Sequence, residues 1–331
     1  MRGSLKTGPL LYAAVLVAAA VAGYLYQLRT QGIFACTASG YYAPPSYLAY
    51  CDAKAYGDYD HGAFWYGLEP EAVRRASGAQ VLFLGSSRMQ FAFSSQATDQ
   101  WFAAAASPHY LMGFTHTENA TFAAPLLERL KPRARVYVIN VDRFFADRET
   151  DPGADLLHDR NEAPRRYHQK QLWQGVHRRL CTRLTTLCGN SFAYYRSEST
   201  GHWKVRGHAP GNKSLTADAA HEDSGLWPSE GLRARRFIAS LPVDPGCVVL
   251  TIVPYPGTRH AEARAIAAAA GQELIDPPLE GLRTFDGSHL DQASAERFSG
   301  AFYDLAGARI RRCLAPASTA VAGSAAPLRA G

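Results

Sequence analysis

The sequence has few charged residues for its length. Asp, Glu, Lys and Arg make up 19% of its 331 residues, below the roughly one quarter that is usual in soluble domains. Hydrophobic residues make up an ordinary 47%. This composition argues against intrinsic disorder of the whole chain and against a multi-span membrane protein, and the lack of an internal repeat argues against a fibrous one. We therefore expect one large or two small globular domains with a substantial core.

Patterns that mark nucleic-acid, nucleotide or metal binding are also missing. Lys and Arg (35) exceed Asp and Glu (29), for a net charge of +6, but they do not cluster with aromatic residues as in nucleic-acid binders. Neither the phosphate-binding pattern G-x-x-x-x-G-K-[ST] nor the metal-binding pattern H-E-x-x-H occurs. We therefore expect no nucleic-acid partner, no cofactor and no metal site. The histidines of the central region are interpreted as scattered: His158, His168, His177, His202, His208 and His221.

One apolar run lies near the N-terminus. Residues 9–28 carry no charge, and as a helix of about 30 Å they are long enough to cross a bilayer. Arg2 and Lys6 precede the run and Arg29 follows it, so the positive-inside rule predicts a cytoplasmic tail over 1–8 and an extracytoplasmic remainder. We expect a single-pass signal anchor in the inner membrane, with the main domain in the periplasm. A cleaved signal peptide, with small residues at 20–22, and a buried core helix are the alternatives.

The cysteines agree with export. All six follow the apolar run, and an even number in an exported chain permits disulfides. No spacing is C-x-x-C, so a zinc ribbon or a thioredoxin-type redox site is poorly supported. Six unpaired buried thiols are the alternative to a disulfide framework. Neighbouring positions suggest the pairs Cys36–Cys51 and Cys181–Cys188, which leaves Cys247–Cys313.

Short apolar strands alternate with helices from about residue 79 onward. Continuous apolar strands separated by helices are typical of a parallel sheet that is covered on both faces. The apolar runs predict five strands, at 81–84, 109–114, 136–139, 247–253 and 273–275. The spacing of apolar residues predicts helices at 118–130, 169–184, 260–270 and 292–313.

Three other regions depart from this alternation. Residues 143–235 are long and polar, and we expect them to form an insertion over the carboxyl edge of the sheet, with a separate small domain as the alternative. Residues 29–78 are expected to form an irregular, aromatic-rich extracytoplasmic lead-in. Residues 314–331 are rich in Ala, Pro and Ser, and we expect a disordered tail there. The main domain then covers 79–313.

Two short clusters could carry chemistry, and both lie at the ends of predicted elements. Gly85-Ser86-Ser87 follows the first predicted strand, where a serine hydroxyl can face a ligand at the carboxyl edge of the sheet. Asp286 and His289 lie three residues apart before the last predicted helix. A carboxylate in that position can orient the imidazole, so that its other nitrogen accepts a serine proton. Taken alone, each cluster also fits a turn or a helix cap.

The chain order Ser, Asp, His is that of α/β-hydrolases, but their G-x-S-x-G elbow is not met. These residues instead resemble the two end blocks of the SGNH (GDSL-like) hydrolase superfamily. Its G-D-S block corresponds to Gly85-Ser86-Ser87, with Ser86 in place of Asp, and its D-x-x-H-L block corresponds to Asp286 to Leu290. The resemblance implies an α/β, flavodoxin-like three-layer sandwich with strand order 2-1-3-4-5. It also implies Ser87 as the nucleophile, His289 as the general base and Asp286 as its orienting partner.

The middle blocks of the family are matched less well. The resemblance implies an oxyanion hole formed by Ser87 and Gly113. The family's oxyanion asparagine block is not reproduced, and Asn140 or Asp142 could stand in its place. Arg88 is interpreted as a structural partner of Asp142, with a substrate carboxylate as its alternative partner.

An N-terminal anchor followed by such a domain resembles membrane-anchored proteins of the DltD-like and alginate-acetylation type. This implies a serine-dependent acyl ester hydrolase or O-acyltransferase, acting on envelope or extracellular polysaccharide beside a membrane O-acyltransferase partner. A general secreted carboxylesterase and a non-catalytic assembly or binding protein are the alternatives.

Overall fold

The computed structural model describes residues 8–41, 45–207, 213–214, 225 and 227–315 of the chain. Apart from residue 8, the expected cytoplasmic tail lies outside the described residues. The expected disordered tail also lies outside them, apart from residues 314 and 315.

A five-stranded parallel sheet forms the centre of the molecule, as predicted from the apolar runs. The strands lie in the order β10-β9-β5-β3-β4, and every pairing between them is parallel. When only these five strands are counted along the chain, the second strand (β4) lies at one edge of the sheet, beside the first strand (β3). They are β3 (Val81–Ser86), β4 (His109–Phe114), β5 (Val136–Asn140), β9 (Val248–Thr251) and β10 (Leu274–Ile275).

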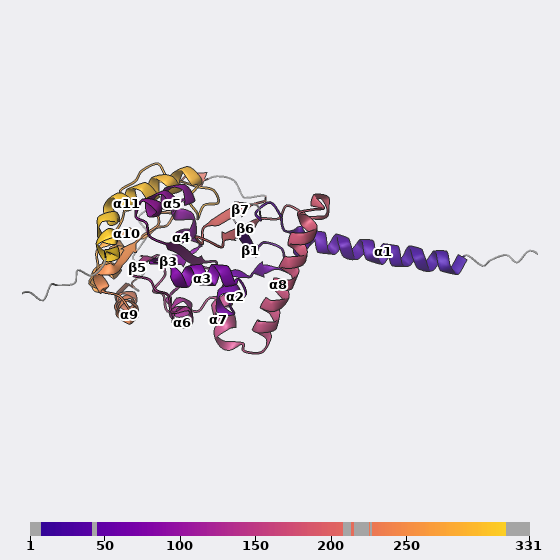
Figure 1. Cartoon of the computed structure of the whole chain (residues 1–331), viewed down its shortest axis with the longest axis horizontal. Coiled ribbons are helices and arrows are strands. Elements are labelled where there is room, and N and C mark those ends of the chain that lie inside the picture. The colour runs from indigo at the N-terminus through magenta and orange to yellow at the C-terminus, as the bar shows by residue number, and fades with distance from the viewer. Residues whose placement is uncertain (1–7, 42–44, 208–212, 215–224, 226, 316–331) are drawn as a thin grey trace, which may run out of the picture.

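Helices cover both faces of this sheet, which gives three layers (Figure 1). Successive residues of a strand point to opposite faces, so Leu82 and Leu84 belong to one core whereas Val81 and Phe83 belong to the other. The first core is covered by α3 (Pro70–Gly78), α6 (Ala120–Leu130), α9 (Trp227–Ser240) and α10 (His260–Ala269). The second is covered by α4 (Ser87–Ala92), α5 (Ser95–Ala104) and α11 (Gln292–Leu314).

A second, antiparallel sheet joins the lead-in to the insertion. Its order is β2-β1-β6-β7, so strands of residues 29–78 pair with strands from within 143–235. The expectation of an irregular lead-in was wrong, because its first strand pairs with a strand more than a hundred residues away. These strands are β1 (Ser46–Cys51), β2 (Gly57–Asp58), β6 (Ala193–Ser197) and β7 (Trp203–Arg206).

The remaining elements surround these two sheets. The lead-in also contains η1 (Ile33–Ala35) and α2 (Asp60–Trp65). A third, two-stranded sheet pairs β8 (Lys213–Ser214) with β11 (Arg283–Thr284). The insertion adds α7 (Asp151–His158), α8 (Glu162–Cys181) and η2 (Thr185–Leu187), and η3 (Pro245–Cys247) precedes β9.

The disulfide framework is confirmed in full. The sulfur atoms join Cys36 to Cys51, Cys181 to Cys188 and Cys247 to Cys313. The first bond ties η1 to β1 within the lead-in, and the third ties η3 to the end of α11. These covalent links restrict the unfolded chain and thereby stabilise the fold.

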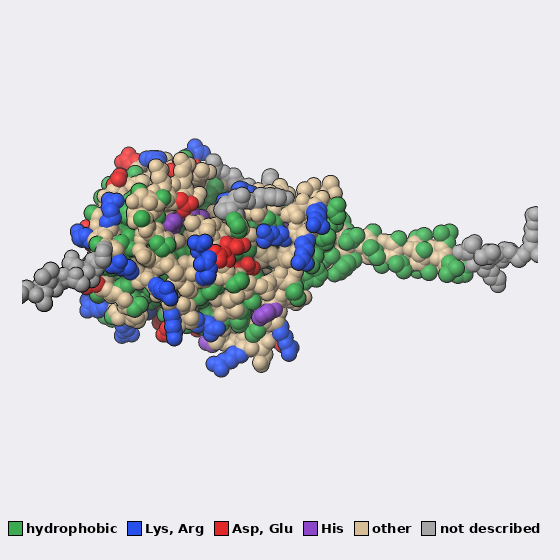
Figure 2. All heavy atoms as spheres, viewed as in Figure 1, with side chains coloured by type: hydrophobic (Ala, Val, Ile, Leu, Met, Phe, Trp, Pro, Cys, Tyr) green, Lys and Arg blue, Asp and Glu red, His purple; other side chains and the backbone are tan. Residues whose placement is uncertain are grey.

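The N-terminal helix α1 (Gly8–Thr30) extends away from the rest of the molecule (Figure 1). It has no buried residue, and its mean hydropathy reaches 1.9. Figure 2 shows hydrophobic side chains along its visible surface. A helix of this length and composition can serve as a membrane anchor or as a signal sequence.

One fully buried ion pair connects the two large sheets. Arg196 on β6 donates to both carboxylate oxygens of Asp60, and neither side chain is exposed. The same guanidinium donates to the carbonyl oxygens of Leu111 and Gly113 at 2.5 Å each. Tyr47 on β1 donates to the same Asp60. The end of β4 is therefore held by a residue of the insertion.

We expect Arg196→Met to lower the free energy of unfolding by about 3–5 kcal/mol, because it leaves the Asp60 carboxylate buried without its cation. The matched control is Arg206→Met on the neighbouring strand, where the side chain is exposed and the cost should stay within about 0.5 kcal/mol. Chemical unfolding measures both. An equal loss of unfolding free energy in the two variants would show that the buried Arg196–Asp60 pair does not stabilise the fold.

Candidate active site

The fold positions Ser87 at the junction of a central strand and a helix. Ser86 ends β3 and Ser87 begins α4, while the Ser86 hydroxyl caps the helix by accepting from the Arg88 N–H. A side chain at Gly85 would come within 3.0 Å of the Met89 Cβ atom. The glycine therefore allows the strand to turn tightly into the helix, so that Ser87 lies at the carboxyl edge of the sheet.

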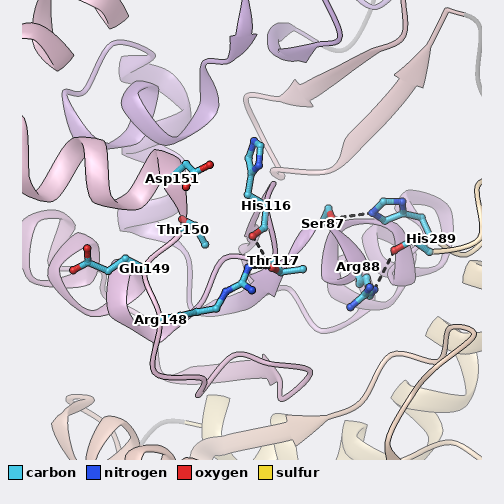
Figure 3. A pocket seen from close by; sticks show the side chains of 10 residues that line it. Ser87, Arg88, His116, Thr117, Arg148, Glu149, Thr150, Asp151 and His289 are labelled. Carbon is cyan, nitrogen blue, oxygen red and sulfur yellow. Dashed lines mark hydrogen bonds between the residues drawn. The ribbon is translucent and has the colours of Figure 1, made fainter. Parts of the chain in front are cut away.

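The structure brings the three predicted site residues together. His289 Nε2 lies 2.8 Å from Ser87 Oγ (Figure 3), and His289 Nδ1 lies 2.5 Å from Asp286 Oδ2. The second carboxylate oxygen accepts from the backbone N–H groups of Ser288 and His289. Asp286 thus fixes both the imidazole and the loop that carries it.

Two aromatic rings hold the imidazole of His289 from the sides. Phe285 stacks on it with an interplanar angle of 19°, and Phe91 of α4 meets it edge-on at 5.0 Å. His289 is 9% exposed. The ring therefore has little freedom to rotate away from Ser87.

The charge state of Asp286 suits this arrangement. Burial alone would raise the pKa of its carboxyl group, but the hydrogen bonds from His289 and from two backbone N–H groups lower the pKa below the usual range. Asp286 is therefore a carboxylate at neutral pH, and it accepts the hydrogen bond from His289 Nδ1–H.

A cleft of about 590 Å³ opens over Ser87. One side consists of the catalytic candidates, and the opposite side comes from the loop after β4 and from the start of the insertion (Figure 3). The lining residues are Ser87, Arg88, His116, Thr117, Arg148, Glu149, Thr150, Asp151, Ser288 and His289. Sequence reasoning missed the opposite side, because its residues belong to no recognisable motif.

Arg88 is a partner of Asp142, as interpreted from the sequence. Its guanidinium contacts the Asp142 carboxylate and lies 3.5 Å above the centre of the Tyr255 ring. The Arg88 Nε–H also donates to the Ser288 hydroxyl at 3.2 Å. Arg88 therefore links α4 to the loop that carries His289, and its charge is already compensated.

The two further oxyanion candidates lie on strands beside β3. Gly113 is opposite Gly85 in the ladder, and a side chain there would come within 2.5 Å of the Ser86 carbonyl oxygen. Asn140 ends β5 and is fully buried, and its side-chain oxygen accepts from the Val253 N–H. Its amide nitrogen makes no hydrogen bond among the described residues. Both roles remain predictions.

A buried network of charges supports the opposite side of the cleft. His61 on α2 lies 2.9 Å from Asp58 through Nδ1 and 2.9 Å from Glu118 through Nε2. Thr115 donates to Asp58, and Thr150 donates to Glu118. Because Thr150 lines the cleft and Thr115 precedes two lining residues, this network sets the position of that side.

The network also changes the protonation of its histidine. Burial alone would lower the pKa of His61, but the charge and hydrogen bonds of Asp58 and Glu118 raise it to about 10. His61 is therefore a cation at neutral pH, balanced by two carboxylates.

Histidines also take part in two clusters that could hold a metal ion. One consists of His177, Cys181 and Cys188, but its two sulfur atoms are bonded to each other. The other consists of Asp99, His109 and His202. None of these residues lines the cleft.

Comparisons with known proteins add no family to this description. No protein-family model matches the chain, and neither a curated protein nor a solved structure matches it. The resemblance to SGNH hydrolases therefore rests on the two short sequence blocks, and a functional proposal has to rest on the geometry of the cleft.

The raised pKa of His61 predicts a pH dependence of stability. The folded chain holds this proton more tightly than the unfolded chain, whose histidines titrate near about pH 6.5. The stabilisation of the fold by protonated His61 is therefore complete below about pH 6.5 and is lost as the pH rises to about 10. The unfolding free energy of the wild type should fall over this range by more than that of His61→Gln. Parallel curves from urea unfolding would contradict a charged His61.

Proposed function

We propose that this protein is a serine-dependent acyl ester hydrolase or O-acyltransferase. The observation that carries the proposal is the continuous chain from Ser87 Oγ to His289 Nε2 (2.8 Å) and from His289 Nδ1 to Asp286 Oδ2 (2.5 Å), at the edge of an open cleft. A nucleophile, a base within hydrogen-bond reach and a group that orients the base are the requirements for nucleophilic acyl transfer.

The first half-reaction forms an acyl-enzyme. His289 Nε2 takes the proton of Ser87 as Oγ attacks the acyl carbonyl carbon, and a tetrahedral intermediate forms. Collapse of this intermediate breaks the ester C–O bond, and His289 returns the proton to the leaving alkoxide. Asp286 holds Nδ1–H throughout and stabilises the imidazolium.

The negative oxygen of the intermediate needs hydrogen-bond donors. Ser87 is the first residue of α4, and the first N–H groups of a helix have no partner within it. We propose the backbone N–H groups of Ser87 and Gly113 as donors, with the side-chain amide of Asn140 as a third. One such donor is worth about 3 kcal/mol elsewhere.

The second half-reaction transfers the acyl group to water or to a sugar hydroxyl. His289 deprotonates the acceptor, whose oxygen attacks the acyl carbonyl and releases Ser87 Oγ, which regains the proton. The acceptor's nature decides between hydrolysis and transfer, and an open cleft admits both.

We propose a polysaccharide of the cell envelope or the extracellular matrix as the substrate. A second cleft of about 600 Å³ adjoins the first and shares Arg148 with it. Two adjoining clefts suit an extended polymer better than a small isolated ester. The resemblance to membrane-anchored SGNH proteins of the DltD-like and alginate-acetylation type supports the same substrate class and a membrane O-acyltransferase as partner.

We further propose that α1 anchors the protein in the inner membrane, with the remaining chain in the periplasm. The exposed apolar surface of α1 supports an anchor. The three disulfides support an oxidising compartment for the domain.

We expect a fluorophosphonate probe to label the wild type covalently, because Ser87 is activated by His289. Ser87→Ala should abolish labelling. The matched control is Ser86→Ala, which loses the helix cap at a cost of about 1 kcal/mol but should still be labelled. Mass spectrometry of the modified peptide identifies the serine.

An unlabelled wild type would contradict the enzymatic proposal and would favour a non-catalytic binding protein. Labelling of Ser87→Ala at the wild-type rate would contradict the assignment of the nucleophile.

We expect Asp286→Asn to lower kcat for p-nitrophenyl acetate by about 10⁴-fold, because the amide favours the wrong tautomer of His289. The test compares the turnover of both proteins with and without an added oligosaccharide. Appearance of acetylated sugar would identify a transferase, whereas fast hydrolysis that no sugar diverts would favour a general carboxylesterase. Near-normal turnover by Asp286→Asn would exclude its proposed role.

A further inference from the structure

We propose that Asp99, His109 and His202 form a binding site for one zinc ion, with an open coordination position. The three ligand atoms lie within 4.8 Å of one another. The site is separate from the site of the proposed acyl transfer. His109 begins β4, whereas Ser87 is located at the other end of that strand, near Gly113.

The distances between the ligand atoms fit a shared metal ion. Asp99 Oδ1 lies 3.2 Å from His109 Nε2 and 3.3 Å from His202 Nε2. Two ligands that are each about 2.0–2.1 Å from a tetrahedral zinc ion lie about 3.3 Å apart. The carboxylate oxygen and each imidazole nitrogen therefore already have the separation of a tetrahedral site.

The two imidazole nitrogens also lack any other partner among the described residues. Both Nε2 atoms are buried and make no hydrogen bond, although each faces the same carboxylate oxygen. His109 is 8% exposed and His202 is 4% exposed. Leaving two buried polar atoms without a hydrogen bond costs free energy, and a bound cation would remove that cost.

Packing holds the ligands in place. The His109 ring stacks on Phe102 with centroids 4.3 Å apart and an interplanar angle of 18°. The backbone carbonyl of His202 accepts from the Ser197 N–H at 2.8 Å, which closes the β6–β7 turn. Asp99 projects from α5. The three ligands thus come from three elements, and the two histidines are fixed by contacts of their own.

Access from solvent is open on one side. Asp99 is 49% exposed at its side chain, and a cavity of about 340 Å³ is lined by Asp99, Phe102, His109 and Thr200 among others. Two imidazoles and one carboxylate with a water in the fourth position form a common zinc ligand set. Soft metals that prefer thiolates are disfavoured, since the set has no sulfur.

Zinc bound here would fasten the β6–β7 turn to the central sheet. That turn already contacts β4, because the Leu111 N–H donates to the Thr200 carbonyl oxygen. The metal would add a second link, from His202 in the turn to His109 in β4 and Asp99 in α5. Its binding should therefore raise the melting temperature of the whole domain.

The test uses the full chain in detergent, stripped of metal with a chelator that is then removed. Titration with ZnCl₂ should show one equivalent bound and a rise in Tm. Asp99→Asn and His202→Ala should each weaken the affinity at least about tenfold and remove the Tm rise. His158→Ala, an exposed histidine paired with Glu149, is the matched control and should bind as the wild type does.

Cobalt gives a second readout that does not depend on stability. The wild type with Co²⁺ should show the visible absorption of a tetrahedral site, and Asp99→Asn, altered at a half-exposed position, should lose it while keeping its circular dichroism. A wild type that binds no zinc, or binding that survives both Asp99→Asn and His202→Ala, would overturn the proposal.

Discussion

The buried pair of Arg196 and Asp60 is the constraint on which the arrangement of this molecule depends. A guanidinium without solvent has to find a carboxylate and several carbonyl oxygens, and Arg196 finds Asp60 in the lead-in and the carbonyls of Leu111 and Gly113 in β4. This requirement joins a strand of the insertion, a helix of the lead-in and the edge strand of the central sheet. The two polar regions that flank the predicted α/β pattern therefore belong to the same packed unit as the sheet.

The candidate catalytic residues and the opposite side of the cleft come from different parts of the chain. Ser87, Asp286 and His289 lie on the α/β framework, at the ends of β3 and before α11. The opposite side of the cleft comes from the loop after β4 and from the start of the insertion. The buried charges of Asp58, His61 and Glu118 hold that side in place. In the proposed function, such a division would keep the reacting groups fixed while the facing loops determine what enters the cleft.

The central sheet and the three site residues could be predicted from the sequence because their signals are local. Buried parallel strands appear as continuous apolar runs, and each half of the site lies within five residues. The second sheet could not be predicted. Because β1 is buried along most of its length, it lacks the alternation of buried and exposed residues that is typical of an antiparallel strand, and its partner β6 follows more than a hundred residues later. The same holds for Asp99, His109 and His202. Their convergence depends on how α5, β4 and the β6–β7 turn pack, and no spacing in the chain encodes it.

The junction between α1 and the domain determines how far the cleft can reach. Hydrogen bonds of α1 continue through Gln31 and Gly32, and the buried turn η1 starts at Ile33. No flexible spacer separates the helix from the domain. In an anchored protein, the cleft would work at a constant height above the bilayer. An acceptor polymer of the proposed kind would then have to come to the cleft at that height.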